Sequence, residues 1–557
     1  MKFFLTTTAA RTSMKSVQHL LSLGSAALLV SLAVLHAAES GKPNIVFIFA
    51  DDWGWGDLSC HGHPWLKTPN LDRLASEGID FQQFNVLNPV CSPSRCAAVT
   101  GHFPARYSIH QHFAAPAQNL ERNMPDWLDP KAPTIARFLQ QAGYRTGHFG
   151  KWHLTSRNIH GAPTPEAYGF DEFSIFNGGA ELPSADLHAT PDNAVKFIRA
   201  NKDRPFFVNV WLHESHLPHV PVKESLEKWQ ELDEQKRVYA AVITDGDNAV
   251  GRVLDALKAT GVEQNTIVLF SSDNGPESTG NMPEQNLRDT DVGSVGFGGY
   301  YSVGSTSGLR GRKRSLFEGG VRVPFIVRWP GHTPAGAKND STVFTAVDLL
   351  PTLCAAAGVK LPLAYHGDGE NLLAALNGQP AVRTRPIFWQ WQGKMAEPDW
   401  WPRLAVREGE WKLALTDDAK RVELHRLNAD RGESADAAPD HPDIVNRLTK
   451  LVLDWKITLP AKPDPLCIST TDRSDSKGNS NKRRKAAATP EQPAKKATPD
   501  RARAFERMDL NKDGLLTLDE YQAGLKSGKN LEQRFKNFDK NNDGKLTPKE
   551  FATPDGE

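Results

Sequence analysis

Residues 44–52 read Asn44-Ile45-Val46-Phe47-Ile48-Phe49-Ala50-Asp51-Asp52, an unbroken apolar run that ends on two carboxylates. A short apolar run of this kind is typical of a strand buried on both faces, as in a parallel sheet. Similar runs recur at 144–149, 206–212, 266–270 and 321–327, and helical patterns lie between or after them at 133–141, 238–258 and 347–357. This alternation predicts an α/β fold, a large and mostly parallel sheet flanked by helices.

The pattern changes after residue 385, which predicts a separate subdomain. Short runs at 387–391, 403–406, 411–415 and 422–424 predict a small antiparallel sheet, closed by a helix near 442–455. Four of its tryptophans could stack on sugar rings, but packing within the sheet is the favoured interpretation: Trp389, Trp391, Trp400 and Trp401. Residues 460–500 are rich in Ser, Lys, Pro and Ala, a composition typical of a flexible linker.

Two twelve-residue segments near the C-terminus repeat the spacing of a calcium loop. Oxygen-bearing side chains occupy loop positions 1, 3, 5, 9 and 12, with glycine at position 6 where the chain turns. These side chains are Asp509, Asn511, Asp513, Thr517 and Glu520 in the first loop, and Asp539, Asn541, Asp543, Thr547 and Glu550 in the second. Two consecutive matches predict a helical EF-hand pair at 501–557 that binds Ca²⁺. The predicted domains before it are the α/β catalytic domain at 43–385, the antiparallel subdomain at 386–459 and the linker at 460–500.

The N-terminus has the order of a secretory signal. Basic residues are followed by an apolar run at 20–35 and by small residues at Ala37 and Ala38. We interpret residues 1–38 as a signal peptide and the mature protein as exported, without membrane association after cleavage. A membrane anchor is the alternative, and translation from Met14 rather than Met1 would give a shorter signal.

The overall charge argues against nucleic acid as a partner. Lys and Arg total 66 and Asp and Glu total 66, so the formal net charge is zero. The five cysteines are too few for a disulfide scaffold and form no Cys-x-x-Cys pair.

Polar side chains follow several of the predicted strands. Open α/β sheets bind ligands at the carboxyl ends of their strands, so these residues are expected to converge. They are Asp51 and Asp52, Lys151 and His153, the histidines His213, His216 and His219, and Asp273 and Asn274. The acidic and amide oxygens favour calcium or magnesium over zinc, although each pair alone could be an ordinary strand-end turn or helix cap.

A zinc protease is excluded by the spacing of the histidines. His213 and His216 are three apart, whereas the zincin motif places its histidines four apart on one helix. Pro218 and Pro221 argue against a helix there.

The most specific stretch is Cys91-Ser92-Pro93-Ser94-Arg95, followed by Thr100-Gly101. Pro93 suits the first position of a helix, so Cys91 is expected just before a helix N-terminus, where backbone N–H groups favour an anion. A reactive or disulfide-bonded cysteine beside a helix cap is the alternative interpretation.

With Gly150-Lys151-Trp152-His153 and with Lys313 before Phe317-Glu318-Gly319-Gly320, this stretch resembles the sulfatases of the alkaline-phosphatase superfamily over about residues 43–456. Arg314-Ser315 after Lys313 departs from the family, whose members often carry smaller residues there.

The resemblance implies a cysteine at 91 that a formylglycine-generating enzyme oxidises to 3-oxoalanine (formylglycine), whose hydrate attacks the sulfur of a sulfate ester. It implies that Asp51, Asp52, Asp273 and Asn274, with position 91, bind Ca²⁺. It also implies that Arg95, Lys151, His153, His216 and Lys313 neutralise the sulfate group, and that His216 or Lys313 gives the departing alcohol its proton, with His219 the second choice among the histidines.

We therefore expect an exported sulfatase acting on a sulfated sugar or aryl sulfate. Two alternatives stay open: a phosphate or phosphonate monoester hydrolase on the same fold, and a non-catalytic calcium-dependent glycan-binding protein.

Overall fold

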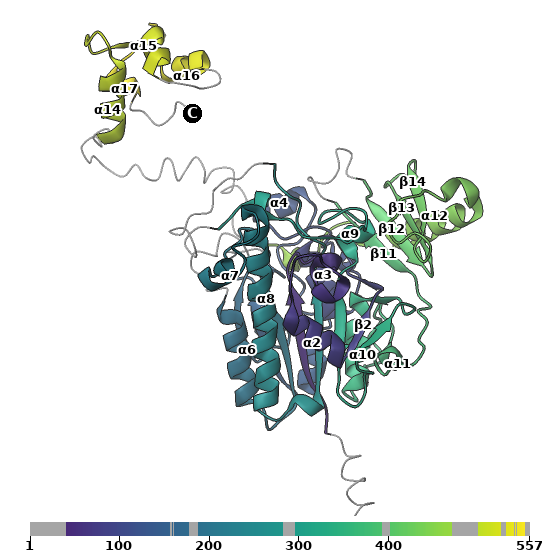
Figure 1. Ribbon diagram of the computed structural model, residues 1–557. Helices are drawn as coiled ribbons and strands as arrows, with labels where there is room; N and C mark the ends of the chain where they lie inside the picture. The colour runs from purple at the N-terminus through teal and green to yellow at the C-terminus, as the bar shows by residue number, and fades with distance from the viewer. Residues whose placement is uncertain are drawn as a thin grey trace, which may run out of the picture. The chain divides into compact units, whose positions relative to one another are not determined.

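The computed structural model describes residues 41–155, 159, 161–177, 188–281, 296–392, 401–470, 499–524, 531–539, 541 and 543–551. The chain divides into two compact units, Met1–Ser476 and Lys477–Glu557 (Figure 1). The predicted signal peptide and the start at Met14 lie outside the described residues, as do Trp400 and most of the predicted linker.

An eight-stranded sheet forms the centre of the first unit, in the order β5-β4-β6-β1-β7-β8-β2-β9. The strands are β1 (Asn44–Ala50), β2 (Ile79–Phe81), β4 (Arg145–Lys151), β5 (Glu172–Phe176), β6 (Phe206–Trp211), β7 (Thr266–Ser272), β8 (Phe325–Arg328) and β9 (Ala337–Asn339). β1 lies between β6 and β7 and pairs in parallel with both. Among the described strands of this sheet, β8 alone runs against its neighbours β7 and β2. The sheet is therefore mostly parallel, as the sequence predicts.

Helices cover both faces of this sheet because successive side chains of β1 point to opposite sides. Ile45, Phe47 and Phe49 belong to one apolar core, with α3, α5 and α10. Val46 and Ile48 belong to the other, with α2, α6 and α8. Burying each of these side chains stabilises the fold by about 1.5–3 kcal/mol. The helices of the first unit are α2 (Pro69–Glu77), α3 (Cys91–Thr100), α4 (Pro116–Glu121), α5 (Ile135–Gln141), α6 (Ala189–Ala200), α7 (Lys223–Lys228), α8 (Glu234–Ala259), α9 (Glu318–Val321), α10 (Leu349–Ala356), α11 (Leu373–Leu376) and α12 (Pro442–Ile457).

One predicted strand is wrong in extent. The run at 321–327 was expected to be a single strand, but its first residue ends the short helix α9, and β8 begins at Phe325. Gly319 and Gly320 pack so closely against neighbouring backbone that a Cβ at either would clash with a carbonyl oxygen. The chain therefore turns there before it enters the sheet. Short strands β3 (Phe84–Asn85) and β10 (Phe344–Thr345) pair beside it.

The small antiparallel sheet is present, in the order β11-β12-β13-β14. Its strands are β11 (Ile387–Gln390), β12 (Leu404–Glu408), β13 (Trp411–Leu415) and β14 (Val422–Arg426). α12 packs against β12 and β13. Trp389, Trp391 and Trp401 are buried, which agrees with packing rather than with sugar binding.

The first part of the predicted linker belongs to the first unit. Asp126 N–H donates to the carbonyl of Cys467 at 2.8 Å, and Ser469 N–H donates to Asp126 Oδ2 at 2.8 Å. Cys467 is buried. Residues 461–470 are therefore anchored, contrary to the linker start predicted at 460, because composition alone does not reveal these contacts.

The second unit is a pair of helix–loop–helix elements joined by a two-residue antiparallel ladder. Its elements are α14 (Pro499–Met508), β15 (Leu516–Thr517), α15 (Leu518–Gly524), α16 (Leu531–Phe538), β16 (Lys545–Leu546) and α17 (Pro548–Phe551). Phe505, Tyr521, Phe538 and Phe551 form part of one apolar core shared by both halves. Within the described part of the chain, no helix is long and apolar enough to cross a bilayer.

Candidate active site

Four oxygen-bearing side chains converge at the carboxyl ends of β1 and β7. Asp51 and Asp52 follow β1, and Asp273 and Asn274 follow β7, whose residue Ser272 pairs with Ala50. All four are buried. Asp52 has a left-handed backbone, with φ of 62°, and its N–H donates to Asp273 Oδ1 at 3.2 Å. Asn274 Nδ2 donates to Asp52 Oδ1 at 2.6 Å. Two adjacent parallel strands thus bring together residues more than 220 positions apart.

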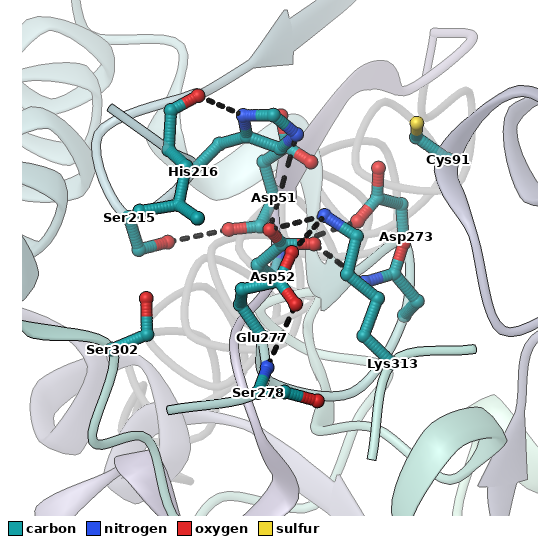
Figure 2. A network of polar contacts seen from close by, with 12 residues as sticks. Asp51, Asp52, Cys91, Ser215, His216, Asp273, Glu277, Ser278, Ser302 and Lys313 are labelled. Atoms are coloured by element: carbon teal, nitrogen blue, oxygen red, sulfur yellow. Dashed lines mark hydrogen bonds and ion pairs between the residues drawn. The ribbon is translucent and has the colours of Figure 1, made fainter. Parts of the chain in front are cut away.

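Each carboxylate of this cluster pairs with a cationic side chain, and Figure 2 shows Lys313 beside Asp52. Arg95 Nη2 lies 2.7 Å from Asp273 Oδ2. Lys151 Nζ lies 2.6 Å from Asp51 Oδ2, and Lys313 Nζ lies 2.5 Å from Asp52 Oδ2. Buried carboxylates without such partners would be strongly disfavoured. The pairs therefore bind the sheet edge to α3, β4 and the loop before α9.

The pKa values of the carboxyls respond to burial and to these cations. Burial and the neighbouring charge of Asp51 raise the pKa of Asp273 well above its ordinary value, although Arg95 opposes them. Burial would also raise the pKa of Asp51, but the neighbouring cations, Lys151 first and also Arg95, outweigh it and hold that pKa well below its ordinary value. Asp51 is accordingly an anion, and the cluster has negative charge to offer to a cation.

The donor set fits a hard divalent cation. One oxygen each of Asp51, Asp52 and Asp273 lie within 4.8 Å of one another. Asp51 Oδ1 and Asn274 Oδ1 are buried and have no hydrogen-bond partner among the described residues. Buried oxygens are normally paired, so these two atoms are available as ligands. Carboxylate and amide oxygens suit calcium or magnesium.

His213 and His216 lie beside the same cluster, on the turn after β6. Asp51, His213 and His216 form a second group close enough to share a metal. However, His213 Nδ1 is 2.5 Å from Asp51 Oδ2 and donates to it, because the carboxylate is an anion that only accepts. The two rings stack at 4.5 Å. Neither residue is on a helix, which agrees with the rejection of the zincin motif.

Cys91 is the first residue of α3, with Val90 as its N-cap. The helix thus starts two residues before the start predicted from Pro93, which occupies its third position. Cys91 lines a cavity of about 750 Å³ together with Lys151, His153 and Lys313. The thiol is buried, although the cavity opens onto it. The start of α3 directs backbone N–H groups and the positive end of the helix dipole towards this wall.

His153 faces the sulfur of Cys91 at 3.1 Å through Nδ1. Its Nε2 lies 3.1 Å from the carbonyl of Phe113, which only accepts, so Nε2 carries the proton and Nδ1 the lone pair. Burial, reinforced by Lys151, lowers the pKa of His153 to about 3. The imidazole is therefore neutral and accepts a hydrogen bond from the group at position 91.

His216 lines the cavity, whereas the second choice among the histidines, His219, is not among the residues that line it. His219 Nε2 lies 2.9 Å from Ser302 Oγ, and the side chain is buried. The structure thus brings together Cys91, Arg95, Lys151, His153, His216 and Lys313 around the carboxylate cluster.

Sequence reasoning missed several residues of the cavity wall. They include His112, Phe113, Asn177, Glu277 and Arg314, which come from loops without periodicity, and Gln118, which belongs to the short helix α4. Glu277 offered a signal, since it lies three residues after Asn274. Its carboxylate contacts Lys313 at 3.3 Å and pairs with Arg314. Burial opposes ionisation, but Lys313 and Arg314 outweigh it and lower the pKa of Glu277 to about 2.

The residues of the two terminal loops have the geometry that their spacing predicts. Asp509 accepts from the N–H groups of Asp513 and Gly514, and Thr517 Oγ1 donates to Glu520. The second loop repeats these bonds with Asp539, Asp543, Gly544, Thr547 and Glu550. Asn511 and Asn541 occupy the third loop positions, and each accepts from the N–H of the aspartate two residues on.

Family models match most of the folded chain. The Sulfatase model covers residues 43–359, the model "N-sulphoglucosamine sulphohydrolase, C-terminal" covers 311–456, and the EF hand model covers 501–526 and 531–553. The EF-hand match confirms the pair predicted from the repeat.

Similar proteins agree with these models. The chain is 30% identical to an N-acetylgalactosamine-6-sulfatase of Canis lupus familiaris, over 78% of this chain and 90% of the relative. It is 31% identical to Arylsulfatase A of Homo sapiens, over 65% and 73% of the two chains. The crystal structure of Ps i-CgsB in complex with k-i-k-neocarrahexaose matches with a TM-score of 0.62 and 25% identity, over 80% and 99%.

The order of the strand-end residues, the fold and these matches lead to one assignment. The chain belongs to the sulfatase family and is a sulfuric ester hydrolase.

Proposed function

We propose that this protein is an exported, calcium-dependent sulfatase that hydrolyses sulfate esters of carbohydrates through a formylglycine formed from Cys91. The observation that carries the proposal is the position of Cys91: its sulfur lies 3.1 Å from His153, in the wall of a cavity that Lys151 and Lys313 also line. A nucleophile at this position would meet a sulfate group between two ammonium groups.

The side chains around that nucleophile have separate roles. Lys151 and Lys313 line the cavity and attract the sulfate oxygens, while Arg95, behind them, holds Asp273 in place. His153 accepts a hydrogen bond from the group at position 91 and so orients it. His216 directs Nε2 towards the site, because its Nδ1 donates to the carbonyl of Leu217 at 2.6 Å.

The cation site belongs to this machinery. Asp51, Asp52, Asp273 and Asn274, with the oxygen at position 91, are the residues that would hold Ca²⁺. When bound, the ion polarises the sulfate ester and favours the deprotonated form of a nucleophilic hydroxyl.

The carbohydrate substrate rests on the relatives and on the shape of the cavity. One relative is named an N-acetylgalactosamine-6-sulfatase, and one similar structure holds a carrageenan oligosaccharide. The cavity of about 750 Å³ exceeds the needs of a sulfate ion and has apolar wall residues, among them Phe113, Pro116 and Leu217. A sugar ring would pack on such a wall.

The domain organisation follows from the same proposal. Residues 43–385 form the catalytic domain and residues 386–459 the antiparallel subdomain, with the linker starting after residue 470. The EF-hand pair would bind Ca²⁺ independently of the active site. The N-terminal signal would export the chain, and a formylglycine-generating enzyme would be its partner during maturation.

Mass analysis of the peptide that contains Cys91 tests the proposal directly. Conversion of the thiol to an aldehyde is expected, together with turnover of a sugar sulfate in preference to the phosphate ester of the same alcohol. An unmodified cysteine in active protein would refute the formylglycine. A preference for the phosphate ester would identify a phosphomonoester hydrolase instead.

A further inference from the structure

Arg314 lies in the wall of the active-site cavity, one residue after Lys313. Its backbone φ is 72°, a left-handed conformation that is strained for a side chain other than glycine. Its N–H donates to the carbonyl of Pro89 at 3.0 Å, two residues before Cys91. The backbone of Arg314 is thus fixed relative to the nucleophile.

Glu277 holds the guanidinium in a defined orientation. Arg314 Nη2 donates to Glu277 Oε2 at 2.8 Å, and Nη1 pairs with Oε1. A guanidinium has five N–H donors, so this fork uses two. Among the described residues no other acceptor binds the guanidinium of Arg314, and a quarter of the side chain is exposed. The remaining donors are available to a group in the cavity.

The carboxylate of Glu277 makes further polar contacts. Glu277 also accepts from Ser278 N–H at 2.8 Å and lies 3.3 Å from Lys313 Nζ, and it is buried. Lys151 and Lys313 each pair with a carboxylate of the cluster. Among the described residues that line the cavity, Glu277 is the one carboxylate, against three cationic side chains. The wall beyond Lys313 therefore presents donors and positive charge to the ligand.

We propose that Arg314 is a specificity-determining residue that binds a second anionic group, a sulfate or a carboxylate, next to the ester that is hydrolysed. The inference rests on the proposed function, because the sugar sulfate must occupy the cavity beside Cys91. Glu277 orients Arg314 and moderates its charge. Arg314 and Glu277 therefore have opposite effects on selectivity.

The test compares three substrates: N-acetylgalactosamine 6-sulfate, its 4,6-disulfate, and a disaccharide in which a glucuronate precedes the 6-sulfated sugar. Wild type is expected to prefer at least one dianionic substrate in kcat/KM, and which one it prefers distinguishes sulfate from carboxylate. R314Q is expected to reduce that preference about tenfold, mainly through KM, since a charge-assisted hydrogen bond is lost. R314K should restore part of it.

E277Q leaves Arg314 without its counter-charge. The preference for the dianionic substrate should therefore be kept or should increase, whereas R314Q lowers it. R204Q, which removes a guanidinium from an exposed position outside the cavity, is the control. Its kcat/KM ratios between the substrates should equal those of wild type. Equal losses on all substrates in both R314Q and E277Q would overturn the proposal, as would a wild type that prefers the monosulfate. A protein that hydrolyses none of the three esters and no aryl sulfate would refute the proposed function itself. If R314Q does not fold, R314K and E277Q decide the question.

Discussion

The sulfur of Cys91 and the Nδ1 atom of His153 are 3.1 Å apart, although Cys91 begins α3 and His153 lies two residues after the end of β4. The carbonyl of Phe113 fixes the ring by accepting from Nε2. The group at position 91 therefore has one orientation, with its polar atom towards the imidazole and the cavity.

Cys91→Ala is expected to lower sulfatase activity by on the order of 10³-fold or more, because the nucleophile is lost. Its unfolding free energy should fall by about 1 kcal/mol or less, since few atoms leave the cavity wall. Cys96→Ala is the matched control: Cys96 lies in the same helix, fully buried and facing the core. It should lose a similar amount of stability and keep its turnover. Normal activity in Cys91→Ala would contradict the assignment of the nucleophile.

Truncation after Thr470 should leave a folded and active enzyme whose activity still depends on the divalent cation. The cut follows Cys467 and Ser469, whose backbone atoms bind Asp126, and it removes the second compact unit. Thermal unfolding and kcat/KM, each with and without a chelator, are the measurements. Loss of activity with the cation present would show that the EF-hand pair is needed for function.

Glu214 gives a pH dependence of stability. Burial raises its pKa from 4.5 to about 7. The folded protein therefore keeps a proton that the unfolded chain loses above about pH 4.5. The free energy of unfolding falls as pH rises from about 4.5 to about 7, by about 3 kcal/mol at most, and then levels off.

Glu214→Gln removes this ionisation. The variant should gain stability relative to wild type between pH 5 and pH 8, as measured by denaturant unfolding at each pH. Glu224→Gln, at an exposed position, should show no such change. A difference between Glu214→Gln and wild type that is constant over this range would contradict the predicted ionisation.

The fold was largely predictable because strand burial is encoded locally. Uninterrupted apolar runs such as 44–50 locate buried strands, and their polar ends locate the carboxylate cluster. Strand direction is not encoded in this way, so the antiparallel direction of β8 was not predicted. α8 begins at Glu234, before the apolar pattern, because Asp233 caps a first turn that faces solvent. His112 and Arg314 reach the cavity from loops whose course depends on long-range packing, and no local pattern reports that.

The proton donor to the departing alcohol is expected to be Lys313 rather than His216. Burial and the charges of Lys151 and Lys313 hold the pKa of His216 well below its ordinary value, so this ring is neutral and lacks the second proton that an acid needs. Burial opposes the charge of Lys313, but Asp52 and Glu277 outweigh it and raise its pKa, so the ammonium is present.

Lys313→Ala should lower kcat on a sugar sulfate roughly 10²- to 10⁴-fold more than kcat on an aryl sulfate. A sugar alkoxide needs a proton to leave, whereas a phenolate does not. Lys313→Arg separates charge from acidity, because a guanidinium keeps the charge but holds its proton. This variant should therefore recover kcat on the aryl sulfate more than kcat on the sugar sulfate. His216→Ala should lower kcat on both substrates by similar factors, since a neutral ring contributes to binding and not to proton donation. Measurement of kcat on both esters for the three variants decides between the two residues. A selective loss of the sugar sulfate in His216→Ala, with equal losses in Lys313→Ala, would move the acid to His216.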